Sequence, residues 1–158
     1  MLVIDGHNLI GSGLLPGISL SDPDDEQRLI AMLRNFRAHH PDEAVQVVFD
    51  PGREGGLAGA KHEGGITVSF APRGSTADAV IMKTLRRAAN PRRLTVVSSD
   101  NAVRSAARAE GAQVVSAQEF AVRLIARPRK RGGIRQGDKP ELNAADVDYW
   151  LERFKQRR

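Results

Sequence analysis

Residues 2–8 read LVIDGHN, a short apolar run that ends at Asp5 and is followed by a glycine. Such a run, bounded by a turn signal, is typical of a strand buried on both faces of a parallel sheet. The pattern returns in VQVVFD, which ends at Asp50, and in LTVVSSD, which ends at Asp100. A fourth aspartate, Asp78, lies in STADAVI, where a helix is expected to begin. Ligands bind beyond the carboxyl ends of the strands in such sheets, so we expect the four aspartates to share one crevice.

Outward from these runs, apolar segments alternate with stretches of helical period, which is typical of an α/β layered fold. The expected strands are 2–5, 44–49, 66–71, 94–98 and 113–115. The expected helices are 24–39, 76–89, 101–110 and 117–126. In the first of these helices an apolar stripe recurs at spacings of three and four, formed by Leu29, Met32, Leu33 and Phe36.

Two segments interrupt the alternation. Residues 51–65, PGREGGLAGAKHEGG, contain six glycines and are expected to form a mobile loop beside the crevice. Residues 127–142 are rich in Arg and Lys and are expected to link the body, residues 1–126, to a last helix over 143–158. That helix presents an apolar face around Trp150, which must pack on the body, on a second copy in a homodimer, or on another partner.

Composition narrows the class of protein. The 158 residues suffice for one ordinary domain, and the absence of cysteine excludes disulfides and thiolate metal sites. No apolar run approaches the length of a membrane span and no signal peptide is evident, so we expect a cytoplasmic protein that does not enter membranes. Residues 127–139 carry six basic residues and one acid, which equals the whole net charge of +5, and the rest of the chain is balanced. This segment favours a polyanionic partner, and a solvated linker is the alternative.

Each of the four aspartates also has a purely structural interpretation. Asp5 suits a turn at a strand end, Asp50 the start of an Asp-Pro-Gly turn, and Asp100 the N-cap of a helix. Asp78 stabilises a helix N-terminus, with Ser75 or Thr76 as the cap. One such residue would be unremarkable, but four at one sheet edge would repel each other unless cations or protons bind there. Ligands that are all oxygen favour Mg²⁺ or Mn²⁺, which can activate water for phosphodiester hydrolysis.

Other residues are candidates for holding the substrate. Asn8 can coordinate an ion through its carbonyl or orient a phosphate oxygen, and an Asx turn is its structural alternative. Arg28, by its helical phase, is expected near the mouth of the crevice. The remaining candidates are Arg73, Asn101, Arg129, Lys130 and Arg131. We expect His7 to pack in a turn, and the acids of SDPDDE, residues 21–26, to mark a helix start.

Taken in order, DGHN, VVFD, TAD and SSD resemble the motifs of the YacP-like branch of the NYN domains, which belong to the PIN-like nuclease group. The resemblance covers residues 1–126. It implies a Rossmann-like three-layer α/β/α sandwich around a mostly parallel five-stranded sheet, and a metal-dependent endoribonuclease. It maps the catalytic acids to Asp5, Asp78 and Asp100 and a family aspartate to Asp50. Relatives often carry a glutamate shortly before TAD, where this chain has Gly74 and Ser75.

We therefore predict a ribonuclease with Mg²⁺ or Mn²⁺ at Asp5, Asp50, Asp78 and Asp100, acting on single-stranded or structured RNA, with association with the ribosome left open. The alternative is a non-catalytic RNA- or ribosome-binding module on the same fold, in which the aspartates are turn and cap residues. A small-molecule phosphohydrolase is a third class, but the chain has no P-loop and no Asp-x-Asp nucleophile motif at the end of an expected strand. The sequence does not choose between one metal and two, nor does it name the RNA.

Overall fold

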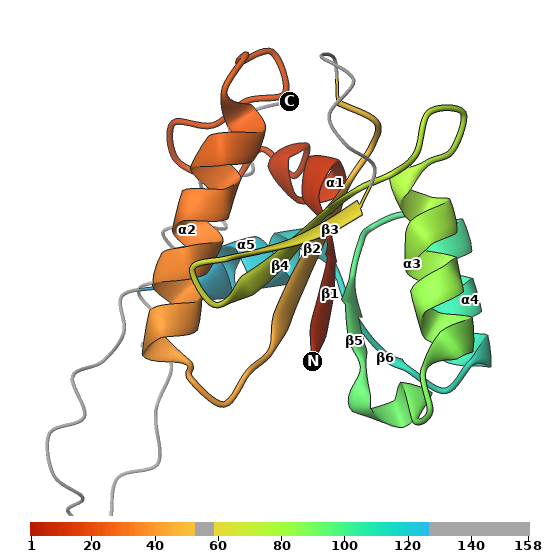
Figure 1. Cartoon of the computed structure of the whole chain (residues 1–158). Coiled ribbons are helices and arrows are strands. Elements are labelled where there is room, and N and C mark those ends of the chain that lie inside the picture. Colours follow the sequence, from red (N-terminus) through yellow and green to blue (C-terminus); the bar gives the residue numbers. More distant parts are fainter. Residues whose placement is uncertain (53–58, 127–158) are drawn as a thin grey trace, which may run out of the picture. The chain divides into compact units, whose positions relative to one another are not determined.

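A computed structural model describes residues 1–52 and 59–126, which form one six-stranded sheet with helices on both faces (Figure 1). The strands are β1 Leu2–Asp5, β2 Val45–Phe49, β3 Gly59–Glu63, β4 Ile66–Phe70, β5 Thr95–Val97 and β6 Gln113–Val115. The helices are α1 Gly6–Ile10, α2 Asp25–His39, α3 Ala77–Arg87, α4 Asn101–Ala109 and α5 Ala117–Ile125, with a 3₁₀ helix η1 at Pro91–Arg93. The α/β sandwich expected from the sequence is confirmed.

The sheet places β1 at its centre. The strand order is β3-β4-β2-β1-β5-β6, and all neighbouring pairs except β3–β4 are parallel. Three parallel strands, β2, β1 and β5, therefore end side by side at one edge. The four central strands are buried almost throughout, as the continuous apolar runs predicted.

The sheet has six strands where five were expected. The additional strand, β3, lies within the segment that was expected to be a loop, and its first four residues are exposed. It pairs antiparallel with β4 across a turn at Gly64 and Gly65, whose φ angles are 56° and 80°. Two successive residues with positive φ suit a tight hairpin, and glycine adopts them without strain. The strand lacks an apolar face because it lies at the edge, so periodicity gave no signal for it.

A second unexpected element is the short helix α1, which begins directly after Asp5. The sequence predicts a tight turn at Gly6, but Gly6 is not among the glycines with positive φ. A Cβ on Gly6 would lie 2.2 Å from Cε1 of Phe49, a distance that real side chains do not tolerate. Glycine is therefore required because α1 packs directly against the end of β2.

Helices cover the two faces of the sheet unequally. On one face α1, α2 and α5 enclose a core that includes Ile4, Leu33 and Phe120, each fully buried. On the other face α3 and α4 enclose a smaller core around Val96 and Ile81 (Figure 1). No helix within the described residues is both long and apolar enough to cross a membrane. The predicted basic linker, residues 127–142, and the predicted last helix, residues 143–158, lie outside the described residues.

Candidate active site

The register of the central strands brings three aspartates to one edge. Asp5, the last residue of β1, pairs with Val48 of β2, so Asp50 lies two residues further along the neighbouring strand. On the other side Ile4 pairs with Val97 of β5, which places Asp100 just beyond the end of that strand. Asp78 enters the same region from the first turn of α3.

Three of the four aspartates also accept backbone hydrogen bonds. Only Asp100 has the structural role expected from the sequence, the N-cap of a helix, whereas Asp5 caps α1 rather than a turn and Asp50 binds the start of α3. Oδ1 of Asp5 accepts from the N–H of Asn8 at 3.1 Å and caps α1, while Oδ1 of Asp100 accepts from the N–H of Val103 at 3.0 Å and caps α4. Oδ1 of Asp50 accepts from the N–H of Ala77 at 2.9 Å, across to the start of α3. Each bond uses one carboxylate oxygen. The bonds fix one oxygen of each side chain, and the second oxygen of Asp50, Oδ2, lies 3.4 Å from Nδ1 of His7.

Burial and mutual repulsion perturb two of the carboxyls. Desolvation, with smaller contributions from the charges of Asp78 and Asp50, raises the pKa of Asp5 from 3.8 to about 6, and the Asn8 N–H and His7 oppose the rise. Asp5 is only 6% exposed. The pKa of Asp78 is raised by desolvation and by the charges of Asp100 and Asp50, while a hydrogen bond with Asp5 lowers it. All four carboxyls, drawn from four elements, are thus within electrostatic reach of each other.

The chemistry of this donor set fits a hard divalent cation. The four side chains offer oxygen donors, and a positive charge between them would offset the desolvation and repulsion that raise the pKa values of Asp5 and Asp78. Within residues 1–52 and 59–126, however, no three Asp, Glu or His side chains come together as ready-made ligands of one ion. Mg²⁺ commonly keeps several waters and uses only one or two protein carboxylates. Asp5, Asp50, Asp78 and Asp100 therefore fit a partly hydrated ion better than a closed cage.

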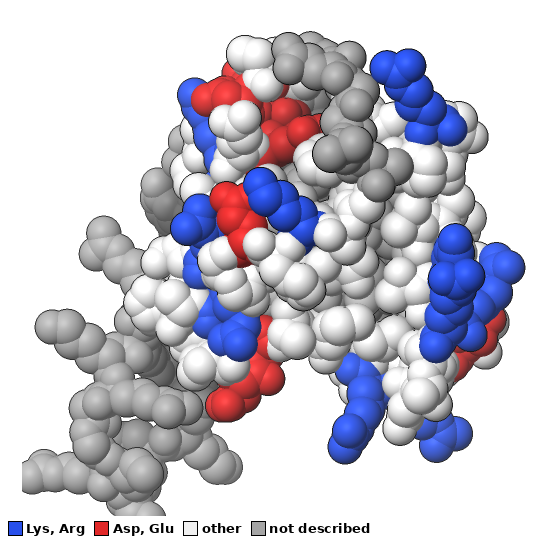
Figure 2. Space-filling model, in the orientation of Figure 1, with Lys and Arg blue, Asp and Glu red and all other residues white. Residues whose placement is uncertain are grey.

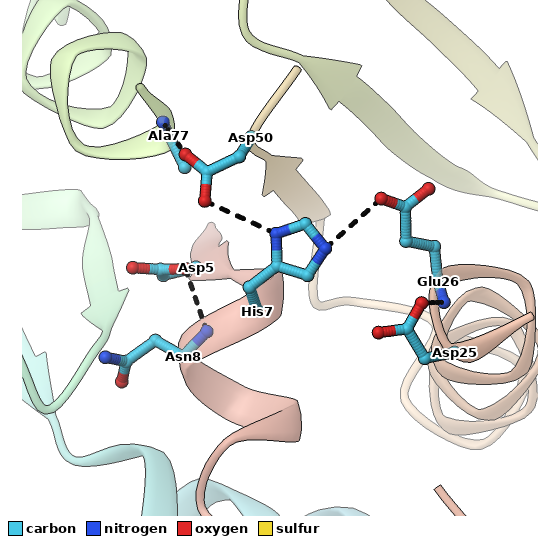
Figure 3. A network of polar contacts seen from close by, with 7 residues as sticks. All are labelled: Asp5, His7, Asn8, Asp25, Glu26, Asp50 and Ala77. Carbon is cyan, nitrogen blue, oxygen red and sulfur yellow. Dashed lines mark hydrogen bonds and ion pairs between the residues drawn. The ribbon is translucent and has the colours of Figure 1, made fainter. Parts of the chain in front are cut away.

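His7 joins this cluster to a fifth acid (Figure 3). Nδ1 of His7 lies 3.4 Å from Oδ2 of Asp50, and Nε2 lies 3.2 Å from Oε1 of Glu26. A protonated imidazole can donate to both carboxylates at once, whereas a neutral one can donate to only one. The ring also packs edge-on against Phe49, with centroids 5.4 Å apart. His7 lies on α1 rather than in a turn, and it connects α1, β2 and α2.

Glu26 is a residue that sequence reasoning missed. The sequence predicts that Glu26 is one of the acids at the start of a helix, and it does lie in the first turn of α2. Its neighbour Asp25 is buried, and Oδ1 of Asp25 accepts from the N–H of Glu26 at 2.8 Å (Figure 3). The sequence shows only successive acids at one helix start, and contact of Glu26 with His7 depends on the tertiary fold.

Asn8 is held in one orientation. Its Oδ1 accepts from the N–H of Ser99 at 2.7 Å, and the Ser99 hydroxyl in turn accepts from the N–H of Ala117 and donates to Gln118. Because a backbone N–H must meet the amide oxygen, the Asn8 NH₂ group is the part left to act on a ligand. This favours donation to a phosphate oxygen over coordination of an ion.

The structure treats the other candidates differently. The Arg28 side chain donates to Oδ2 of Asp24 at 2.8 Å and to the carbonyl of Gly17 at 2.6 Å. These contacts hold the loop before α2 rather than the acidic edge. Arg73 is exposed in the loop before α3, and Asn101 is exposed at the first position of α4. Arg129, Lys130 and Arg131 lie outside the described residues.

Comparison with known proteins agrees with this architecture. The model of the YacP-like NYN domain matches residues 2–152. The crystal structure of Rae1 (YacP) from Bacillus subtilis is 20% identical with a TM-score of 0.61, over 99% of this chain and 80% of that one. A tryptophan-to-leucine mutant of Rae1 is 19% identical with a TM-score of 0.60, over 99% and 84%. At such identities the likeness shows the fold alone. The search of curated proteins found no match.

Proposed function

The chain belongs to the YacP-like NYN domain family, and from this premise we propose that it is a divalent-metal-dependent endoribonuclease that hydrolyses RNA phosphodiester bonds at the acidic edge of the sheet. The family is generally one of PIN-like ribonucleases, so a nuclease related to RNA is the coarse expectation. One observation supports the finer assignment. Four carboxyls from four elements lie near the carboxyl ends of β1, β2 and β5, and there burial and the charges of neighbouring acids raise the pKa values of Asp5 and Asp78.

The proposal gives the acids distinct tasks. Asp5, Asp78 and Asp100 are the catalytic acids, and with Asp50 they hold one or two ions of Mg²⁺ or Mn²⁺. When bound, such an ion polarises a phosphate oxygen and lowers the pKa of a water molecule. Burial of Asp5 suits this task, because a desolvated carboxylate gains more from a nearby cation than an exposed one.

Neighbouring residues orient the acids and the substrate. The Asn8 NH₂ group donates to a non-bridging phosphate oxygen, since its own oxygen is occupied by Ser99. His7 fixes Oδ2 of Asp50 while Ala77 fixes Oδ1, so the carboxylate plane of Asp50 is set from both sides. Arg73, Asn101 and the basic residues Arg129, Lys130 and Arg131 are proposed to contact the RNA backbone. Ribosome association and a homodimer through residues 143–158 belong to the same proposal.

Cleavage of a labelled 20-nucleotide RNA tests the assignment. Incubation with Mn²⁺ or Mg²⁺ should give internal cleavage products, and EDTA should prevent them. Asp78→Asn should abolish the products while leaving RNA binding unchanged or tighter, because one repulsive charge is lost. Asp42→Asn is the matched control, since it removes one negative charge from an exposed loop and should cleave normally. Equal cleavage by Asp78→Asn and the wild type would refute the catalytic assignment.

A second candidate is the non-catalytic RNA- or ribosome-binding module. The observation in its favour is that Asp5, Asp50 and Asp100 each accept a backbone N–H and so have a structural role without any ion. The same experiment separates the two functions. A binding module would give a salt-sensitive complex with the RNA and no metal-dependent products.

A further inference from the structure

The charge balance of the body conceals a separation along the chain. Residues 1–78 carry eleven acidic and six basic residues, whereas residues 79–126 carry eight basic and three acidic ones. The second stretch contains α3, η1, β5, α4, β6 and α5, all within the described residues. Residues 1–78 are therefore net negative by five charges and residues 79–126 net positive by five, which the net charge of zero over residues 1–126 does not reveal.

Six of these basic residues form what we call the basic face. They are Lys83, Arg86 and Arg87 on α3, Arg92 and Arg93 on η1, and Arg108 on α4. All six are exposed, and within residues 1–52 and 59–126 none of them makes an ion pair. Figure 2 shows Lys and Arg side chains over the outer side and lower end of α3, with acidic side chains beside them and others near the start of α2.

The fold brings these residues to one region. Lys83, Arg86 and Arg87 are spaced by three and four, so they share a stripe on α3 opposite the buried Ile81 and Leu85. A Cβ on Gly111, in the turn after α4, would lie 3.6 Å from Cγ of Arg92, so η1 and the end of α4 are neighbours. The backbone agrees, because the N–H of Gln113 donates to the carbonyl of Leu94 at 2.9 Å.

Helix dipoles explain only part of this arrangement. Arg86, Arg87 and Arg108 lie in the last turns of α3 and α4, where the helix dipole favours a positive charge. Lys83 lies a turn earlier. Arg92 and Arg93 belong to a 3₁₀ helix of three residues, whose dipole is too small to require two arginines. Exposed cations without acidic partners are the electrostatic footprint of a polyanion site.

We propose that the basic face binds the phosphate backbone of RNA, as a second contact area away from the acidic edge. The idea rests on the proposed function for its choice of RNA as the polyanion. α3 begins at the acidic edge with Asp78 and ends at the basic face, and its 11 residues span about 16 Å. At about 3.4 Å per phosphate along a strand, RNA of about five nucleotides covers this length. The basic face would thus hold RNA whose scissile bond lies among the acids.

Binding of a fluorescent 20-nucleotide oligo(U) RNA in EDTA tests the proposal without cleavage. The variant of the full chain combines Lys83→Gln, Arg87→Gln and Arg93→Gln. The matched control combines Lys61→Gln, Arg34→Gln and Arg123→Gln, which removes the same charge from one Lys and two Arg on other elements. Circular dichroism of all three proteins establishes that they are folded.

Loss of three phosphate contacts should lower the slope of log K against log salt by about 2, since each contact on single-stranded RNA contributes about 0.7. If the affinities converge near 1 M salt, the basic-face variant binds about a hundredfold more weakly at 0.1 M. The control should stay within about threefold of the wild type. Equal weakening of both variants would reduce the effect to net charge and overturn the proposal.

Two further outcomes are informative. If the basic-face variant binds RNA like the wild type but no longer binds polyglutamate, the face takes an acidic protein and the proposal fails. If binding falls as expected but wild-type protein never cleaves RNA with Mn²⁺, the basic face stands and the nuclease assignment fails. If the wild type cleaves RNA with Mn²⁺ but the three substitutions leave RNA binding unchanged, the nuclease assignment stands and the basic-face proposal fails.

Discussion

Helices α3 and α4 each carry opposite charges at their two ends. α3 has Asp78 in its first turn and Arg86 and Arg87 in its last, while α4 is capped by Asp100 and carries Arg108 in its last turn. The helix macrodipole favours both placements, by similar amounts. If the macrodipole were the only effect, the charges at the two ends would stabilise each helix to a similar degree.

The environments of the two ends make them different. A carboxylate near a helix N-terminus should have a lowered pKa, but the pKa of Asp78 is raised because desolvation and the charges of Asp100 and Asp50 outweigh the dipole. The arginines at the other ends are exposed and meet no such opposition. The acidic end of α3 therefore costs stability, and the basic ends do not. Folding does not require such a cost, which is the physical reason to assign the chemistry to the acidic ends.

The largest effect should come from removing a charge at the acidic end without disturbing the helix. Asp100→Asn should lower the rate of metal-dependent RNA cleavage on the order of a thousandfold, the scale of losing one electrostatic partner of a transition state. Asparagine caps helices as well as aspartate, so the melting temperature should change by no more than about 3 °C. Single-turnover cleavage in Mn²⁺ and thermal unfolding in EDTA measure the two effects.

Asp100→Ala separates the two roles of this residue. It should lose the same activity and in addition about 1 kcal/mol of stability, because the N–H of Val103 loses its acceptor. If Asp100→Asn unfolds as readily as Asp100→Ala, then Asp100 acts through the fold, and the contrast between the two helix ends disappears.

The packing of Gly6 against Phe49, next to Asp5, should be nearly as sensitive to substitution. Gly6→Ala places a methyl group 2.2 Å from the present position of the Phe49 ring, so either α1 or Phe49 must move. We expect a loss of about 3 kcal/mol in the free energy of unfolding, as for other overpacked cores. Urea unfolding measures this loss. Phe49→Leu should be less harmful in the Gly6→Ala background than alone, and additive losses would contradict the steric explanation.

The free-energy cost of burying a carboxyl at the acidic edge of the sheet can be measured through Asp5, the last residue of β1. Its pKa is about 6 in the folded protein against 3.8 for the free side chain. The folded state thus holds the proton more tightly, so Asp5 contributes stability below pH 3.8 and loses it as the pH rises through about 6. Asp5→Asn keeps an acceptor for the Asn8 N–H and should stabilise the protein in EDTA at pH 7.5 by about 2 kcal/mol.

The sign of this effect should depend on pH and on metal. Near pH 4 the advantage of Asp5→Asn should vanish, because the wild-type carboxyl is then protonated in the folded protein. Addition of Mn²⁺ at pH 7.5 should stabilise the wild type and leave the variant nearly unchanged. If Asp5→Asn is less stable than the wild type in EDTA at every pH, the ionised Asp5 carboxyl does not destabilise the folded protein.

His7 is expected to have a moderate effect. His7→Gln should reduce cleavage about tenfold, because loss of a residue that orients a ligand typically costs 10–100-fold. Glu26→Gln should act through the same bridge, so the double variant should be little worse than either single one. Cleavage rates of the four proteins measure the coupling, and full additivity would mean that His7 and Glu26 act separately.

Much of the fold and the choice of the four aspartates could be predicted from the sequence. β1, β2, β4 and β5 are buried on both faces, so each appears as an uninterrupted apolar run, and alternation with helices predicts a mostly parallel sheet but not the order of its strands. The short strand β6 was also predicted, although it lies at the other edge of the sheet and is less buried. β3 was missed because an exposed edge strand needs no apolar pattern and is held by backbone pairing with β4.

Properties that depend on tertiary contacts could not be predicted in this way. Gly6 is required by Phe49, which lies 43 positions away, and no local rule connects them. Glu26 reaches His7 only because α2 starts beside α1. The balance of charge over residues 1–126 was correct as a count but concealed the basic face, since a count ignores which end of a helix carries each charge.

The smallest effect should be on stability at the basic end. Lys83→Gln, Arg87→Gln and Arg93→Gln together should change the free energy of unfolding by less than about 1 kcal/mol, because only Arg87 lies where the α3 dipole is felt. The others make no ion pair within the described residues, so their removal leaves no acid unpaired. Urea unfolding measures the change. A loss above about 2 kcal/mol would mean that these cations hold α3 and η1 in place, and their exposure would then no longer favour an RNA partner over a structural one.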